Sequence, residues 1–258
     1  MNPQTILNNS PGLHGKNILI TGGSSGIGRG TVDVLLAAGA RVAIASRRIP
    51  PELPESVLAL TCDVSDPEQV DAAVAETVQT FGGLHGLFAN AGMVIFEEFL
   101  TMSNETWRKT MSVNLDGVFY ATRAAARHMA QNGGGAIVTT SSVRAVASSP
   151  LHAAYSATKG AVDALVVQLA TELGPLGIRI NSIQAGAVSS EMLEHAARLF
   201  ADGDSEKLNA SFLHMIPLNR IGTPAEIGCL AAFLLSDAAS YITGACIPAD
   251  GGMLARLV

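Results

Sequence analysis

Short apolar runs alternate with longer amphipathic stretches along almost the whole chain. The apolar runs predict seven strands, within residues 17–21, 41–46, 57–64, 83–92, 135–142, 178–186 and 244–252. The stretches between them predict helices, the clearest running from the glycine-rich turn to residue 38 and over residues 67–81, 104–131 and 152–173. Such alternation is typical of a parallel sheet with helices on both faces. The pattern therefore predicts a single α/β domain with a doubly wound parallel sheet of about seven strands.

Three stretches depart from this alternation. Residues 47–55 read RRIPPELPE, and the three prolines predict that the crossover helix there is missing or reduced to a turn. Residues 187–222 have an irregular helical pattern beyond the carboxyl end of a strand, so we expect a segment that covers the substrate. Residues 1–15 form a polar N-terminal extension without the apolar centre of a secretory signal, and residues 16–258 form the domain.

Composition narrows the function classes. Hydrophobic residues make up 48% of the chain and charged residues 15%, which is ample for a core, but no apolar run reaches the roughly 18 residues of a membrane span. The net charge of −6, without a basic stripe, argues against nucleic acid as a partner. Neither the three cysteines nor the histidines have metal-ligand spacing, so we expect no metal site. A cytoplasmic location is the default.

A glycine-rich turn, TGGSSGIG at residues 21–28, joins the first strand to the first helix. Gly22 permits the tight exit from the strand, Gly26 lets a phosphate approach the backbone, and Gly28 lets the helix pack against the sheet. The free N–H groups at the helix N-terminus favour a pyrophosphate. We therefore expect a dinucleotide to bind against Gly22, Ser24, Ser25, Gly26, Ile27 and Gly28.

The end of the second strand bears on the choice of cofactor. NAD-binding sheets usually place a carboxylate there for the ribose hydroxyls, whereas this chain has Ser46, Arg47 and Arg48. A guanidinium donates two charge-assisted hydrogen bonds to a 2′-phosphate, and Ser46 adds a hydroxyl. The sequence favours NADP(H), with NAD(H) as the alternative if both arginines face solvent.

Tyr155 and Lys159 lie four residues apart at the start of a predicted helix and therefore share one face. A phenol has a pKa of about 10, and lowering this pKa to about 7 needs roughly 4 kcal/mol, to which a nearby ammonium contributes. Ser142 ends the fifth predicted strand, at the edge of the sheet where it can hydrogen-bond a substrate oxygen. The three residues predict proton transfer at a carbonyl or alcohol oxygen.

Together the motifs resemble those of the classical short-chain dehydrogenase/reductase family, in order and in spacing, over essentially the whole chain. They are TGGSSGIG at 21–28, Asp63-Val64, Asn90-Ala91-Gly92, Asn114, Ser142, the run from Tyr155 to Lys159, and Asp250-Gly251-Gly252. The resemblance implies a Rossmann-like fold, an NAD(P)-dependent oxidoreductase acting on CH–OH groups, and a homotetramer built partly through the two long helices.

The resemblance also implies residue roles. Tyr155 would be the general acid in reduction and the base in oxidation, Lys159 would bind the nicotinamide ribose and lower the tyrosine pKa, and Ser142 would hold the substrate carbonyl. Asn114 would position a water in the proton relay. The other residues expected to contact the cofactor are Asp63 and Val64 at the adenine, and Asn90, Ala91, Gly92, Gly186 and Val188 along the cleft.

The chain departs from the family pattern after the sixth strand. The usual Pro-Gly is replaced by Ala185-Gly186, so the close backbone approach that glycine allows is kept but the rigid turn is lost. Ser189 and Ser190 stand where a threonine is common, and either is a candidate to contact the nicotinamide carboxamide.

The substrate pocket is expected to be mainly apolar and to take a small to medium ketone or secondary alcohol. Arg144 is either an anchor for an anionic substrate group or a solvated or interface arginine. The residues assigned to the pocket are Val94, Arg144, His152 and Met192, with Leu193, Leu199, Phe212 and Met215 from segment 187–222. Met93 and Phe96, together with Val94, either form a further apolar wall or pack in the core.

Three functions fit the sequence. The first is an NADPH-dependent carbonyl reductase, which Arg47 and Arg48 favour. The second is an NAD-dependent alcohol dehydrogenase that uses the same residues in the other direction. The third is a dinucleotide-sensing protein without turnover, which the complete set of Asn114, Ser142, Tyr155 and Lys159 disfavours.

Overall fold

The structure, a computed structural model, describes residues 12–201, 204, 210 and 212–256. Most of the predicted N-terminal extension and part of segment 187–222 lie outside these residues. Seven parallel strands form one sheet in the order β3-β2-β1-β4-β5-β6-β7. The strands are β1 (Asn17–Thr21), β2 (Arg41–Ser46), β3 (Leu58–Thr61), β4 (Gly86–Ala89), β5 (Gly135–Ser142), β6 (Ile178–Ala185) and β7 (Cys246–Ala249).

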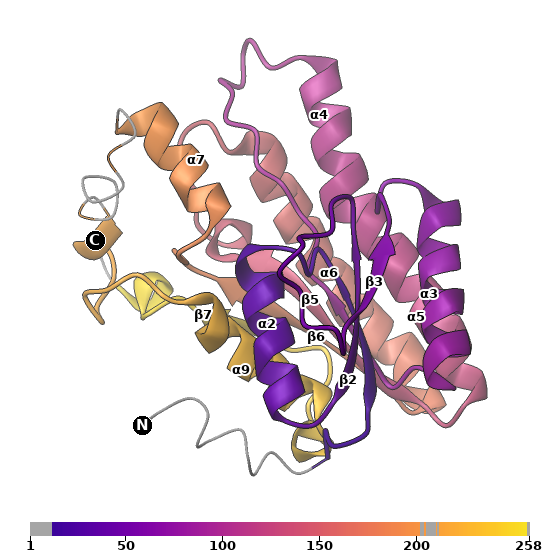
Figure 1. The fold of residues 1–258 in the computed structure, drawn as a ribbon. Coiled ribbons are helices and arrows are strands. Elements are labelled where there is room, and N and C mark those ends of the chain that lie inside the picture. The colour runs from indigo at the N-terminus through magenta and orange to yellow at the C-terminus, as the bar shows by residue number, and fades with distance from the viewer. Residues whose placement is uncertain (1–11, 202–203, 205–209, 211, 257–258) are drawn as a thin grey trace.

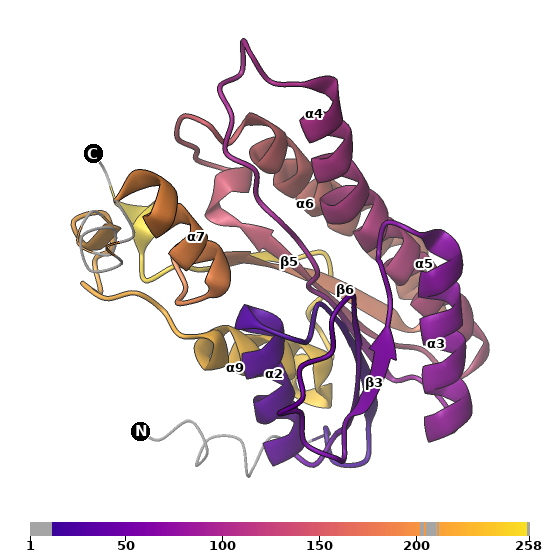
Figure 2. The same cartoon turned by 45° about the horizontal axis from the view of Figure 1, so that its top comes forward.

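Helices cover both faces of this sheet (Figure 1). On one face lie α2 (Gly26–Ala37) and α9 (Pro224–Leu235), and on the other lie α3 (Pro67–Phe81), α5 (Gly117–Gln131) and α6 (Ala153–Leu173). The shorter helices α4 (Asn104–Met111) and α7 (Glu191–Phe200) rise beyond the carboxyl ends of the strands (Figure 2). This arrangement confirms the predicted single-domain, doubly wound fold.

Alternate residues of each strand serve the two halves of the core. In β1, Ile18 and Ile20 pack with α2 and α9, whereas Leu19 packs with the helices on the other face. All five β1 residues are buried, because a central parallel strand has helices on both sides. This explains why the strands are continuous apolar runs in the sequence rather than alternating ones.

The helix boundaries follow local chemistry. Asp66 caps α3 by accepting hydrogen bonds from the backbone N–H groups of Glu68 and Gln69 at 3.0 and 3.3 Å. The helix stops at Gly82, which has a left-handed φ of 81°. Residues 47–57 contain no helix between β2 and β3, so the prediction from the proline-rich stretch is confirmed.

A helical segment does span residues 104–131 as predicted, but it is not a regular α-helix throughout. A π-helical segment, η1 (Ser112–Asp116), lies between α4 and α5. An extra residue in one helical turn leaves no signature in the hydrophobic pattern, so the sequence could not show it. Such insertions are frequent at functional sites.

Two glycines set the distance between α2 and α9. A Cβ on Gly30 would lie 2.5 Å from the Cβ of Pro224, and one on Gly228 would lie 3.0 Å from the Cα of Thr31. The two helices therefore pack almost backbone to backbone, and neither position has room for a methyl group.

We expect Gly30→Ala to lower the free energy of unfolding by about 1–3 kcal/mol, because overpacking outweighs the better helix propensity of alanine. Urea unfolding at a fixed protein concentration measures this. Gly160→Ala is the matched control, since Gly160 lies inside α6 and a Cβ there would make only an ordinary contact, 3.8 Å from the carbonyl oxygen of Ala145. A Gly30→Ala protein as stable as the control would contradict the packing argument.

Candidate active site

The carboxyl ends of the strands open into a cavity of about 880 Å³, within the size range of ligand sites. Most of the site residues predicted from the sequence line it. Gly28 and Asn114 are buried and do not line it, and neither do Ser189 and Leu199. The residues brought together here are Gly22, Ser24, Ser25, Gly26, Ile27, Ser46, Arg47, Arg48, Asp63, Val64, Asn90, Ala91, Gly92, Val94, Ser142, Arg144, His152, Tyr155, Lys159, Gly186, Val188 and Met192.

The glycine turn after β1 is shaped by close backbone contacts. Gly22 has a φ of 68°, and a Cβ there would lie 2.8 Å from the Cα of Ala91. A Cβ on Gly28 would overlap the carbonyl oxygen of Gly22. Both glycines are therefore required for the first turn of α2 to fold back against the sheet.

Asn90 joins the ends of three strands at the point where the strand order reverses. Its Nδ2 donates to the carbonyl oxygens of Gly22 and Thr21 at 3.1 and 3.3 Å, and its Oδ1 accepts from Thr140 Oγ1 at 3.0 Å. The hydroxyl of Thr21 in turn accepts from the backbone N–H groups of Asn90 and Ala91 at 3.1 and 3.2 Å. These bonds fix β1, β4 and β5 relative to one another at the cavity floor.

The N-terminus of α2 faces the cavity without side-chain caps. Ser25 occupies the N-cap position but makes no capping hydrogen bond, and the first turn carries no acidic residue. Its backbone N–H groups and its positive dipole end are therefore available to an anion.

The end of β2 offers a hydroxyl and two cations to the same cavity. Ser46 is buried, and its Oγ has no hydrogen-bond partner within the described residues. Arg47 and Arg48 are exposed at the rim. The carboxylate of Asp63 accepts from the backbone N–H and hydroxyl of Ser65 at 3.0 and 2.7 Å, which lowers its pKa, with a smaller contribution from the charge of Arg47.

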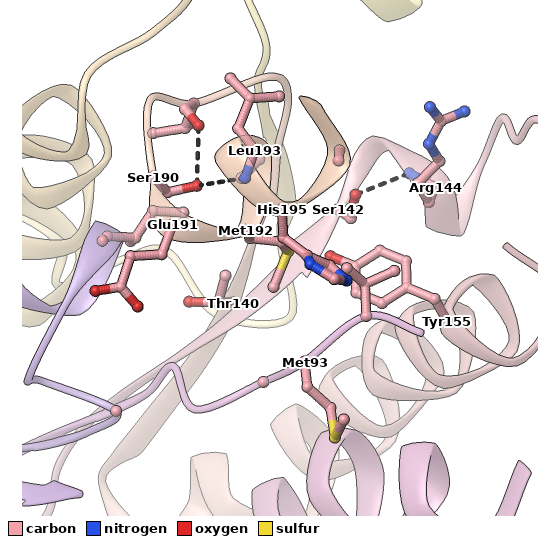
Figure 3. A pocket seen from close by; sticks show the side chains of 18 of the residues that line it. Met93, Thr140, Ser142, Arg144, Tyr155, Ser190, Glu191, Met192, Leu193 and His195 are labelled. Atoms are coloured by element: carbon pink, nitrogen blue, oxygen red, sulfur yellow. Dashed lines mark hydrogen bonds between the residues drawn. The ribbon is translucent and has the colours of Figure 1, made fainter. Parts of the chain in front are cut away.

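Tyr155 lies in the middle of the cavity, between the end of β5 and α7 (Figure 3). Burial raises the pKa of its phenol, while a hydrogen bond to Ser142 and the charge of Arg144 act in the opposite direction. The hydroxyl of Ser142 also accepts from the backbone N–H of Arg144 at 3.1 Å. The phenol is therefore protonated near neutral pH, and the effect expected of Lys159 on its pKa stays a prediction.

Lys159 carries its charge in the interior. Its side chain is 2% exposed, its Nζ donates to the carbonyl oxygen of Thr140 at 2.7 Å, and Nζ lies 5.5 Å from the centroid of the Tyr155 ring. Burial lowers its pKa from 10.5 to about 8, against a smaller opposing effect of Asp163. The ammonium is thus still charged at neutral pH, one helical turn from the tyrosine.

Asn114 lies in the π-helical segment η1 and is fully buried. Its Oδ1 accepts from the backbone N–H of Met93 and its Nδ2 donates to the carbonyl of the same residue, both at 2.8 Å. The side chain therefore anchors the loop after β4 beside Lys159. Its expected role in positioning a water stays a prediction.

Aromatic rings form one wall of the substrate half. Phe96 makes edge-to-face contacts with His152 and Phe200, at centroid distances of 5.1 and 4.9 Å, and lies 6.0 Å from His195. His152 is in turn 6.3 Å from Tyr155. Burial lowers the pKa of His152, so that this ring is neutral near pH 7. The wall beside Tyr155 therefore consists mainly of uncharged aromatic rings.

Helix α7 and the residues after it cover this half. Met192, Leu193, Phe212 and Met215 line the cavity as expected, but Leu199 does not. Leu199 is 53% exposed, because α7 turns other side chains toward the cavity. Of the two serines after β6, Ser190 lines the cavity and caps α7 through Leu193 N at 3.4 Å, whereas Ser189 does not line it.

Known proteins share this sequence and this architecture. The family model described as "Enoyl-(Acyl carrier protein) reductase" matches residues 22–254. The 2,5-dichloro-2,5-cyclohexadiene-1,4-diol dehydrogenase of Sphingobium indicum is 40% identical, over 94% of this chain and 98% of that protein. The L-rhamnose 1-dehydrogenase (NAD(P)(+)) of a Sphingomonas species is 35% identical, over 95% and 98%. The ligand-free aldohexose dehydrogenase of Thermoplasma acidophilum aligns with a TM-score of 0.90 and 32% identity, over 95% and 96%.

The chain belongs to the classical short-chain dehydrogenase/reductase family. It is accordingly an NAD(P)-dependent oxidoreductase that acts on CH–OH groups. The residues present fit such a cofactor, because the N-terminus of α2 has no side-chain cap and suits a pyrophosphate, and Ser46, whose hydroxyl has no partner among the described residues, lines the same cavity. The expected family and fold are therefore confirmed.

Several residues of this short-chain dehydrogenase site were not predicted from the sequence. Thr140 has the same orientation in β5 as Ser142, so the period of two would have pointed to it. Thr21 likewise ends a strand. Three residues of α7 also line the cavity: His195, Arg198 and Phe200. Their contacts depend on the position of α7, and the sequence pattern does not show that position.

In the part of the chain that the structure describes, no group of three or more His, Cys, Asp or Glu side chains is arranged to hold a metal ion. Over the same residues, no helix has the length and apolar character needed to cross a membrane.

The lowered pKa of Lys159 predicts a pH-dependent stability. The unfolded chain holds this proton up to about pH 10.5, whereas the folded chain releases it from about pH 8. The buried charge therefore opposes folding below pH 8, and this penalty disappears as the pH rises toward 10.5. Lys159→Met has no such penalty. We expect its stability relative to the wild type to fall by about 1–3 kcal/mol between pH 7 and pH 10, as measured by urea unfolding without cofactor.

Lys109→Met is the control, because Lys109 is exposed on α4. Its stability relative to the wild type should stay constant over the same pH range. A constant difference for Lys159→Met as well would show that the lysine is not charged at a cost in the folded protein.

Proposed function

We propose that this protein interconverts a ketone and a secondary alcohol with NADP(H), in the carbonyl-reducing direction, with Tyr155 as the general acid. The proposal rests on one observation: Ser142, Tyr155 and Lys159 line the same cavity as the uncapped N-terminus of α2. Burial keeps the phenol of Tyr155 protonated near neutral pH, and a protonated group is what reduction requires of a proton donor.

The chain's own residues handle the proton. The nicotinamide, when bound, exchanges a hydride with the substrate carbon. Ser142 donates a hydrogen bond to the substrate oxygen, and Tyr155 transfers its phenolic proton to that oxygen as negative charge develops there. The charge of Lys159 stabilises the phenolate that remains. Asn114 holds the loop at Met93 against Lys159, where a water can return the proton.

Ser46, Arg47 and Arg48 support NADP(H) as the preferred form. A 2′-phosphate at the end of β2 would meet two exposed guanidiniums and a hydroxyl that lacks a partner within the described residues. The nearest carboxylate, Asp63, is already bonded to Ser65 and follows the neighbouring strand. NAD(H) remains the alternative outcome of the test.

The substrate we propose is mainly apolar and contains a ring. Phe96, Met192, Leu193, Phe212 and Met215 line the half of the cavity near Tyr155. The names of the relatives include a cyclohexadiene diol and sugars, which supports a CH–OH group on a ring.

We also propose a cytoplasmic homotetramer. Trp107 of α4, Phe119 of α5 and Val167 of α6 are 39%, 40% and 55% exposed, which supports contacts between subunits through these helices. A monomer in sedimentation equilibrium would contradict this assembly.

Replacing Tyr155 by Phe tests the reaction. We expect kcat for ketone reduction to fall by at least about 100-fold, because the proton donor is lost while the ring and its packing stay. The Kd for NADPH, from fluorescence titration, should change by less than about threefold. A Tyr155→Phe enzyme that keeps its turnover would overturn the assignment.

Replacing Arg47 by Asp tests the cofactor preference. We expect the Kd for NADPH to rise by about 10- to 100-fold, because charge-assisted hydrogen bonds are lost and repulsion replaces them. The Kd for NADH should change little. Arg108→Asp, on the exposed side of α4, makes the same charge change away from the cavity. Equal affinity of the wild type for both cofactors would defeat the proposal of NADP(H).

A further inference from the structure

Arg144 places a cation beside the general acid. It lies in the short 3₁₀ turn η2 (Val143–Ala145) that directly follows β5, and it lines the cavity. Its side chain is half-buried, and burial lowers the pKa of the guanidinium. Its charge acts on the phenol of Tyr155. A partly desolvated cation at this position is costly unless an anion accompanies it.

The protein does not supply that anion within its described residues. The backbone N–H of Arg144 bonds to Ser142, but no hydrogen bond or ion pair reaches the guanidinium there. In Figure 3 the side chain of Arg144 extends from the turn after β5, and the one dashed line drawn to this residue joins its backbone nitrogen to Ser142. A half-buried arginine usually pairs with a carboxylate or a carbonyl group of its own protein, and Arg144 has no such partner among the described residues.

The charges around the substrate half favour an anion. Glu191 is the one acidic side chain among the described residues that line this half, and Figure 3 places it on the opposite side from Arg144. Arg198 of α7 adds a second, exposed cation at the same cavity. His152 is neutral near pH 7, in part because Arg144 is close.

We propose that Arg144 binds a carboxylate carried by the substrate, so that this enzyme acts on a ring ketone or alcohol with an attached carboxylate group. This inference rests on the proposed function of the same cavity. One unpaired guanidinium matches one carboxylate through two parallel hydrogen bonds. A phosphate, with its higher charge, would call for more cations than Arg144 and the solvated Arg198 provide.

The ion pair also bears on the proton transfer. The charge of Arg144 lowers the pKa of Tyr155, against the larger effect of burial, which raises it. A bound carboxylate offsets the charge of Arg144 and so raises the pKa of the phenol further. The substrate that fits the site thus reinforces the protonation state that burial already gives to Tyr155.

Two matched ketones test this, 4-oxocyclohexanecarboxylate and its ethyl ester. We expect the ratio of kcat/KM for the acid over the ester to fall by about 10- to 100-fold in Arg144→Met, since a charge-assisted pair is lost. Arg144→Lys should retain part of the ratio. Arg198→Met, which removes a solvated charge from the same cavity, should change it by less than about threefold.

A binding measurement makes the test independent of turnover. Cyclohexanecarboxylate and cyclohexanecarboxamide are titrated into the complex with NADP⁺, by calorimetry. We expect the carboxylate to bind the wild type at least about tenfold more tightly than the amide, and the difference to vanish in Arg144→Met. Equal binding of the two in the wild type, or an unchanged ratio in Arg144→Met, would overturn the carboxylate site. Turnover of the ester, and its loss in Tyr155→Phe, would still support the proposed function, so the two failures are distinguishable.

Discussion

The amide of Asn90 is the interaction on which the geometry of the site depends. Its three hydrogen bonds tie Thr21 and Gly22, at the end of β1, and Thr140 of β5 to the residue that follows β4, where the strand order reverses. The connections that leave neighbouring strands at such a switch point run to opposite faces of the sheet, which opens a crevice. The backbone pairing of β1 with β4 ends at the last residue of each strand, and the half-buried amide of Asn90 links the chain segments beyond that point. The glycine turn, the loop at Gly92 and the end of β5 all keep their positions through it.

The same crevice contains a buried positive charge, which lowers the stability of the fold. Lys159 is almost completely buried, and its Nζ donates a hydrogen bond to Thr140, in the strand that Asn90 holds. Buried ammonium groups destabilise folded proteins unless they are paired. Here the ammonium is placed beside a phenol that the surrounding protein keeps protonated. Under the proposed function, this loss of stability lies where proton transfer by Tyr155 needs a nearby positive charge.

The two halves of the cavity are built by different means. The cofactor half consists of strand ends and a helix N-terminus, whose backbone geometry is fixed by the sheet. The substrate half consists of side chains from the loop after β4, from η2 and from α7, which meet through ring contacts centred on Phe96. A family can therefore keep one cofactor site while it changes substrates, because substitutions on α7 and η2 leave the sheet untouched.

The sequence by itself determined the fold class, most element boundaries and most of the residues that line the cavity near the glycine turn. Those features depend on local signals: apolar runs for buried strands, prolines that exclude a helix after β2, and glycines whose turn admits no Cβ. Only the tertiary structure decided that Arg144 has no partner within the described residues, that Leu199 faces outward, and that Asn114 lies in a π-helical turn. Each of these depends on which side chains approach from elsewhere in the chain. Spacing along a sequence records periodicity within an element, but not the distance between elements.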